Sequence, residues 1–284
     1  MNKIFFPTAY TSHSKVAFRY AQKLAQYFEA SITLVHVYES PSSSLVTNAG
    51  LMEENLKQFG EQQRTSHLQK LKAFATEMNA KQFHDIELTF IVTDGDVAHE
   101  LLNIQKEHRF DVIVMGMRKH KLRDRIFGNT TYRIIDEAIC PLLLVPPDVH
   151  FMKVNRMLYG TAFEIGDDKT VDILLDWCLA FDATLNILHV HKKANADQAA
   201  LKMDQLSKGF ENERSEKIIS FQLREGNIVE TLSQHVASTD VDLIAIHRRK
   251  QGFLQRVIDG SLTKLLSEDL TVPLLVLKSQ ATAL

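Results

Sequence analysis

The chain is poor in the residues and runs that mark several classes of protein. It holds only two cysteines, Cys140 and Cys178, and both lie beside apolar residues. We therefore expect buried thiols, not a disulfide or a nucleophile. No apolar run approaches the ~18–20 residues of a membrane-spanning helix, and the first residues are typical of a strand, with no signal-peptide core. These absences predict a cytoplasmic protein.

An excess of charge of one sign is also missing. The chain carries 33 lysines and arginines against 35 aspartates and glutamates, for a net charge of −2. This balance gives no general electrostatic basis for binding nucleic acid or a membrane. Hydrophobic residues make up 45% of the chain and charged residues 24%, which is typical of a globular protein.

What the chain does contain is one pattern written twice. The segment 30–37 recurs as 183–190, and Pro7-Thr8-Ala9 corresponds to Gly160-Thr161-Ala162, both 153 residues later. Farther along, Gly95 corresponds to Gly226 at an offset of 131, so the second copy is shorter by about 22 residues. A repeat this long indicates duplicated domains, with predicted bounds of 1–148 and 149–284.

Each copy alternates apolar runs with helical patterns, which predicts an α/β domain. The first copy has predicted strands at 3–7, 32–37, 86–92, 111–116 and 142–145, and helices after Ser12-His13-Ser14 and at 54–78, 97–107 and 130–138. The second has strands at 156–160, 185–190, 218–223, 242–247 and 274–277, and helices at 169–181, 199–211, 228–238 and 261–267. Continuous apolar strands between amphipathic helices favour two tandem doubly wound, five-stranded parallel sheets of Rossmann-like type.

Ligands of such sheets bind beyond the carboxyl ends of the strands. The candidate ligand-binding residues at these ends are Thr8, Ala9, Val37 and Gly116 in the first copy, and Thr161, Ala162, Val190 and His247 in the second. A basic loop then leads to a helix start, which adds Arg118, Lys119, Gly128, Asn129 and Thr130, and in the second copy Arg248, Lys250, Gly260 and Ser261. A glycine before a serine or threonine at a helix start exposes N–H groups that suit a phosphate.

The motifs taken together resemble the universal stress protein family in its tandem form, over essentially the whole chain. They are the Pro-Thr after the first strand, Leu34-Val35-His36-Val37, the turns at Gly95 and Gly226, the run from Asp111 to Gly116, and Cys140-Pro141-Leu142-Leu143-Leu144-Val145. The resemblance implies a non-enzymatic stress-response or regulatory protein. It also implies that a ligand would be ATP, AMP or another phosphorylated or anionic small molecule, with no cofactor assigned.

The chain departs from the ATP-binding members that it resembles. Those members have an aspartate after the first strand, where this chain has Ala9 and Ala162, and a loop similar to Gly-x2-Gly-x9-Gly-Ser/Thr. The first copy lacks the middle glycine, and in the second copy His247 and Lys250 replace the first two glycines. A degenerate nucleotide site and a ligand-free interaction module with decayed pockets therefore both remain open. An ATP-hydrolysing switch, which needs intact loops, is the weakest reading.

The remaining polar residues are interpreted as follows. The basic loops are either a side-chain clamp for anions or solvated loops. His36 and His189 are interpreted as packed residues with one hydrogen bond, and the spacing of the histidines predicts no metal site. Asp167-Asp168 stands at a predicted helix start, where the helix dipole explains it. No Gly-x-Ser-x-Gly motif and no pyrophosphatase loop are present.

Two predictions concern assembly and asymmetry. The last strands, flanked by Pro141 and Pro273, are sheet-edge candidates, and pairing them would form a pseudo-dimer within one chain. A homodimer remains open as a further assembly. The copies are expected to be unequal, because the first has a longer lid with Ser40–Ser44 and a turn at 48–50, while the second keeps Gly260-Ser261 at the expected spacing. A ligand is therefore expected in the second copy.

Overall fold

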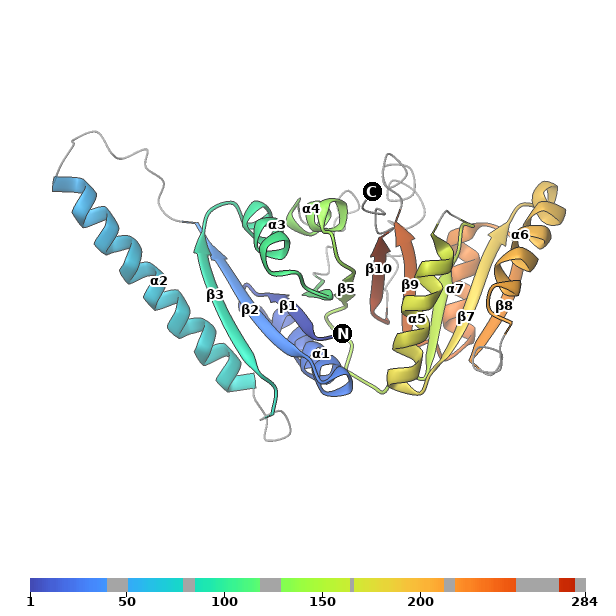
Figure 1. Cartoon of the computed structure of the whole chain (residues 1–284), viewed down its shortest axis with the longest axis horizontal. Coiled ribbons are helices and arrows are strands. Elements are labelled where there is room, and N and C mark those ends of the chain that lie inside the picture. The colour runs from blue at the N-terminus through green and yellow to red at the C-terminus, as the bar shows by residue number, and fades with distance from the viewer. Residues whose placement is uncertain are drawn as a thin grey trace. The chain divides into compact units, whose positions relative to one another are not determined.

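A computed structural model describes residues 1–39, 51–78, 85–117, 129–163, 166–211, 218–248 and 271–278 (Figure 1). Its residues form two compact units, of which the first ends at Leu142 and the second begins at Leu143. The division falls within residues 142–145, close to the predicted junction of the two sequence copies, and each copy is described by itself. The domain bounds of 1–148 and 149–284 stay a prediction.

The first copy has the predicted order of strands and helices. Its elements are β1 (Lys3–Pro7), α1 (Ser12–Phe28), β2 (Ser31–Tyr38), α2 (Leu51–Met78), β3 (Leu88–Asp94), α3 (Val97–His108), β4 (Val112–Gly116), α4 (Asn129–Glu137) and β5 (Leu142–Val145). The strands lie in the order β3-β2-β1-β4, with β5 after β4. Strand β1 pairs in parallel with β2 and β4, and β2 pairs in parallel with β3, with Phe6 of β1 opposite Leu34 of β2. The order reverses direction at β1, as in doubly wound folds.

The second copy repeats this topology. Its elements are β6 (Arg156–Gly160), α5 (Asp167–Phe181), β7 (Thr184–His191), the 3₁₀ turn η3 (Lys193–Asn195), α6 (Ala196–Lys208), β8 (Ile219–Glu225), α7 (Ile228–Ser238), β9 (Leu243–Arg248) and β10 (Leu274–Lys278). The strand order β8-β7-β6-β9-β10 matches that of the first copy. The predicted fold class is confirmed, whereas the helix predicted at 261–267 lies outside the described residues.

The central strands are covered on both faces. Ile4, Phe5 and Phe6 are consecutive in β1 and each is 0% exposed. Because successive side chains of a strand point to opposite faces, a run of buried residues requires packing on both sides. Helices α1, α2 and α3 each contact strands of this sheet, and α1 also contacts α2 while α3 contacts α4.

The start of α1 differs from the sequence prediction. Thr11 is the N-cap, and its hydroxyl accepts the backbone N–H of Ser14 at 3.2 Å. Ser12 and Ser14, after which the sequence predicts the start of the helix, lie inside it. A threonine at this position satisfies one of the N–H groups that a helix start leaves without an intrahelical partner. The helix therefore begins early, close to the end of β1.

Candidate functional site

The structure places the predicted residues of the first copy at the ends of parallel strands. Those that it describes are Thr8, Ala9, Val37, Gly116, Asn129 and Thr130. Thr8 and Ala9 follow β1, and Gly116 ends β4. Asn129 begins α4, with Thr130 in its first turn. The carboxyl ends of neighbouring parallel strands share one edge of a sheet, so Thr8, Ala9 and Gly116 lie at the edge where such folds bind ligands.

The corresponding edge of the second copy carries Thr161, Ala162, Val190, His247 and Arg248. Ala162 is exposed, whereas the side chain of His247 is only 3% exposed. The predicted residues Arg118, Lys119, Gly128, Lys250, Gly260 and Ser261 lie outside the described residues, as do Ser40–Ser44 and the turn at 48–50 of the predicted lid. The basic clamp and the lid stay predictions.

Both copies form the same tight turn after the first strand. Tyr10 and Phe163 occupy the left-handed region, with φ of 59° and 56°. Their backbone N–H groups donate to the hydroxyls of Thr8 and Thr161, at 3.1 and 2.9 Å. A residue with a side chain seldom adopts this backbone conformation unless its surroundings impose it. The threonine hydroxyls that the sequence suggested for a ligand thus already hold the turn.

The repeated histidines fasten this turn to the second strand of each copy. Nδ1 of His36 lies 2.9 Å from the carbonyl oxygen of Thr8, and Nδ1 of His189 lies 2.8 Å from that of Thr161. A carbonyl oxygen only accepts, so each Nδ1 carries the hydrogen. The ring of His189 also packs on Phe163, with centroids 4.1 Å apart. The prediction of packed histidines with one hydrogen bond is confirmed.

In the first copy an aromatic stack covers the end of β2. The ring of His67, from α2, stacks on Tyr38 at 4.4 Å and on His36 at 5.0 Å between centroids. Tyr10 packs on His36 at 4.4 Å, and its hydroxyl donates to the carbonyl oxygen of His67 at 3.3 Å. These contacts hold α2 against the strand ends. No sequence motif singled out His67.

Burial in this stack changes the titration of both imidazoles. The pKa of His36 is lowered mainly by burial, which its hydrogen bond to Thr8 opposes and the charge of Lys70 reinforces. The pKa of His67 is lowered by burial and then by His36 and Lys70. Proton uptake by either ring is therefore harder in the folded protein than in the unfolded chain.

This shift predicts that acid weakens the first copy. The unfolded chain binds more protons than the folded protein between pH 6.5, the ordinary histidine pKa, and the lower folded values. The free energy of unfolding should therefore fall as the pH falls through that range. Urea unfolding at pH 7.5 and 5.5 measures the loss, which should be smaller in His67→Phe because phenylalanine keeps a ring there without the proton. Equal losses in both proteins would contradict this origin.

The second copy holds a buried carboxylate at the start of α5, the helix that follows its first strand. Asp167 begins α5, and its side chain is only 4% exposed. The hydroxyl of Tyr159 donates to Oδ1 at 2.7 Å, and the hydroxyl of Thr161 donates to Oδ2. Nδ1 of His247 lies 3.8 Å from Oδ1. Both carboxylate oxygens accept hydrogen bonds, which is the arrangement of an ionised carboxylate.

This network corrects the interpretation of Asp167-Asp168 as a pair explained by the helix dipole. Asp168 is exposed in the first turn of α5, as that interpretation requires. Asp167 instead points inward, because α5 begins only at this residue, directly after Gly166 with a φ of 96°. The sequence missed the network because the inward direction of Asp167 depends on where α5 begins, and because His247 is distant from the other members along the chain.

The two cysteines are buried thiols, and neither is in a disulfide, as predicted. Burial raises the pKa of Cys178 to about 12, which disfavours a reactive thiolate. Across the described ranges, no three His, Cys, Asp or Glu side chains gather in a way that could hold a metal ion. Among the same residues, no helix has both the length and the apolar character needed to cross a membrane.

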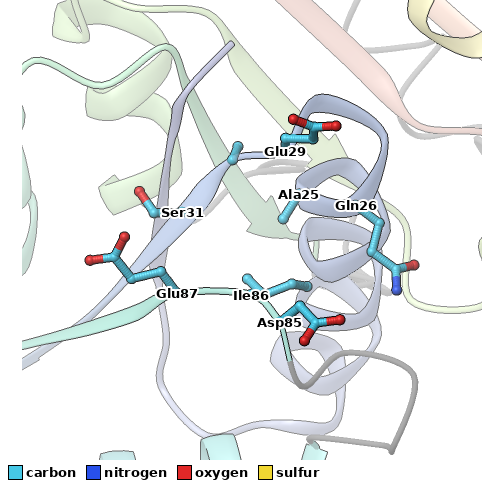
Figure 2. Close-up of a pocket in the computed structure, with 8 residues that line it drawn as sticks. Ala25, Gln26, Glu29, Ser31, Asp85, Ile86 and Glu87 are labelled. Carbon is cyan, nitrogen blue, oxygen red and sulfur yellow. The ribbon is translucent and has the colours of Figure 1, made fainter.

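A separate pocket lies at the opposite edge of the first copy (Figure 2). Its volume is about 450 Å³, and it lies between the end of α1 and the segments leading into β2 and β3. Figure 2 shows the carboxylates of Glu29, Asp85 and Glu87 around it. This is the amino-terminal edge of the strands, so the pocket is distinct from the candidate ligand edge.

Two doubly wound domains with the same strand order and the same histidine-fastened turn define a tandem α/β protein. The model of the universal stress protein family matches residues 1–146 and again 153–278, so the chain belongs to this family in tandem form. A universal stress protein structure from Archaeoglobus fulgidus covers 99% of each chain, with a TM-score of 0.69 and 15% identity, which shows the shared fold.

Two curated relatives match half of the chain each. Universal stress protein MJ0531 of Methanocaldococcus jannaschii is 29% identical over 147 residues, which are 50% of this chain and 81% of the relative. Universal stress protein YxiE of Bacillus subtilis is 26% identical over 148 residues, which are 51% of this chain and 98% of the relative. Each matched stretch is about as long as one copy, consistent with a duplicated domain.

Proposed function

We propose that this chain is a non-enzymatic regulatory protein that binds a phosphorylated small molecule of the ATP or AMP type at the strand ends of its first copy. Helix α4 begins at Asn129, immediately after the glycine of the candidate phosphate loop. Its first N–H groups and the partial positive charge of the helix N-terminus favour an anion. Arg118 and Lys119 follow Gly116 in the sequence and add cations to the same loop.

One observation favours the first copy over the second. The positions that hold Tyr159, Asp167 and His247 in the second copy are occupied by Phe6, Ser14 and Gly116 in the first. None of these three residues of the first copy is charged, whereas those of the second copy include the buried carboxylate of Asp167. An anion near the strand ends therefore meets no opposing buried charge of this kind in the first copy. This reverses the expectation that a ligand prefers the second copy.

The binding role is favoured over an enzymatic one by the chemistry of the sequence. The chain has no Gly-x-Ser-x-Gly motif, and its threonines after the first strands are engaged in the turns. The alternative is a ligand-free interaction module. The hydrogen bonds that already join Tyr159 and Thr161 to Asp167 favour that alternative for the second copy alone.

Calorimetric titration of the full chain with ATP, AMP and inorganic phosphate tests the proposal. Binding should weaken from 0.1 to 1 M salt, because the screening length shrinks from ~10 to ~3 Å. The variant Arg118→Ala/Lys119→Ala should bind several-fold less tightly, whereas Arg19→Ala/Lys23→Ala, with both changes in the middle of α1, should not. Absence of binding for all three compounds would leave the ligand-free module.

A second proposal concerns assembly within the chain. Residues Leu142–Val145 of β5 are all buried, as are Leu274–Leu277 of β10, and each strand follows a proline. We propose that these strands pair the two copies about a pseudo-twofold axis, which would remove two apolar sheet edges. Segments 1–148 and 149–284, produced separately, should each self-associate in light scattering. Two monomeric segments would argue against the pairing.

A further inference from the structure

Four equivalent positions surround the end of the first strand, the start of the first helix and the end of the fourth strand in each copy. In the first copy they hold Phe6, Thr8, Ser14 and Gly116, and in the second Tyr159, Thr161, Asp167 and His247. Only the threonine is shared. The other three exchanges add a hydroxyl, a carboxylate and an imidazole, which together form one network in the second copy.

The helix start explains how the second copy accommodates these groups. In the first copy, a Cβ on Gly116 would lie 2.5 Å from the carbonyl oxygen of His13, so backbone of α1 fills the space beside the strand end. The residue equivalent to His13 is Gly166, which precedes α5 instead of lying inside it. The later helix start is accompanied by a side chain, His247, at the position of Gly116.

The imidazole of His247 is directed inward. Its side chain is 3% exposed, and its Nδ1 faces Asp167. A ring held there is not available at the surface as a cation for an anionic ligand. The carboxylate beside it is 4% exposed, so solvent screens its negative charge poorly. Both effects act at the strand end, at the position that Gly116 holds in the first copy.

We propose that His247 and Asp167 determine ligand specificity between the copies by excluding phosphorylated ligands from the second. The side chain replaces the bare backbone that a phosphate must approach, and the buried carboxylate repels the phosphate charge. The exclusion concerns the second copy alone. It deepens the proposed function, because it assigns phosphate binding to one copy.

Photolabelling of the full chain with 8-azido-ATP, followed by peptide mapping, measures ligand binding in each copy separately. In the wild type, the label should fall on peptides of the first copy. Asp167→Asn removes the charge and keeps the shape, so labelling of the second copy should rise about tenfold or more. The matched control Asp168→Asn removes an exposed charge from the same turn of α5 and should leave that labelling unchanged.

A second variant restores the residues of the first copy and removes the imidazole as well. Tyr159→Phe/Asp167→Ser/His247→Gly should label in the second copy more strongly than Asp167→Asn, with excess inorganic phosphate competing. Circular dichroism checks that each variant is folded, and Asp167→Asn decides the question if the triple variant is not. Labelling of both copies in the wild type would overturn the exclusion, as would the lack of any gain in the folded variants. Missing label in the first copy would contradict the proposed function, whereas a gain in the second copy would still support the exclusion.

Discussion

Replacement of Asp167 by alanine is expected to lower the free energy of unfolding of the second copy by about 3 kcal/mol or more. The change leaves the buried hydroxyls of Tyr159 and Thr161 without their acceptor and His247 without its acidic neighbour. Each buried polar group that loses its partner costs roughly 1–3 kcal/mol. Urea unfolding followed by the fluorescence of Trp177, the single tryptophan and a residue of α5, measures this copy directly.

Two further variants separate the network from a general effect of charge at the helix start. Asp168→Ala removes an exposed carboxylate from the same turn and should cost less than about 1 kcal/mol. The triple variant Tyr159→Phe/Asp167→Ser/His247→Gly removes the three polar groups together. Its loss in the free energy of unfolding, divided by the number of groups removed, should be smaller than the loss in Asp167→Ala. Equal losses in Asp167→Ala and Asp168→Ala would mean that the buried network contributes little.

Much of the fold could be predicted because its signals are local. The strand Lys3–Pro7 and the helix Ile228–Ser238 have the bounds that the apolar patterns indicate. Duplication strengthened the prediction, since an ambiguous run in one copy has a counterpart in the other. Helix starts were less certain: Thr11 caps α1 although serines follow it directly. Any of these residues can cap a helix, and the choice depends on how the chain leaves β1.

The candidate site was predictable in position but not in the direction of its side chains. Strand ends locate Thr8, Gly116 and His247 at the ligand edge, because topology alone fixes that edge. Whether His247 points outward to an anion or inward to Asp167 depends on packing between β9 and α5, which are distant in sequence. The same limit applies to His67, whose partners His36 and Tyr38 belong to a different element.

Gly116→Ala should destabilise the first copy by about 2–3 kcal/mol. The added methyl group would meet the carbonyl oxygen of His13 at 2.5 Å and its carbon at 2.8 Å, and backbone in a packed helix start cannot move aside at little cost. Gly160→Ala is the matched control, because it also ends a parallel strand but has Leu232 Cδ2 as its nearest neighbour, at 4.0 Å. That variant should change stability by less than about 0.5 kcal/mol. Far-UV circular dichroism in urea follows both copies, while Trp177 reports the second. If Gly116→Ala loses no more free energy of unfolding than Gly160→Ala, the start of α1 does not pack closely against the end of β4.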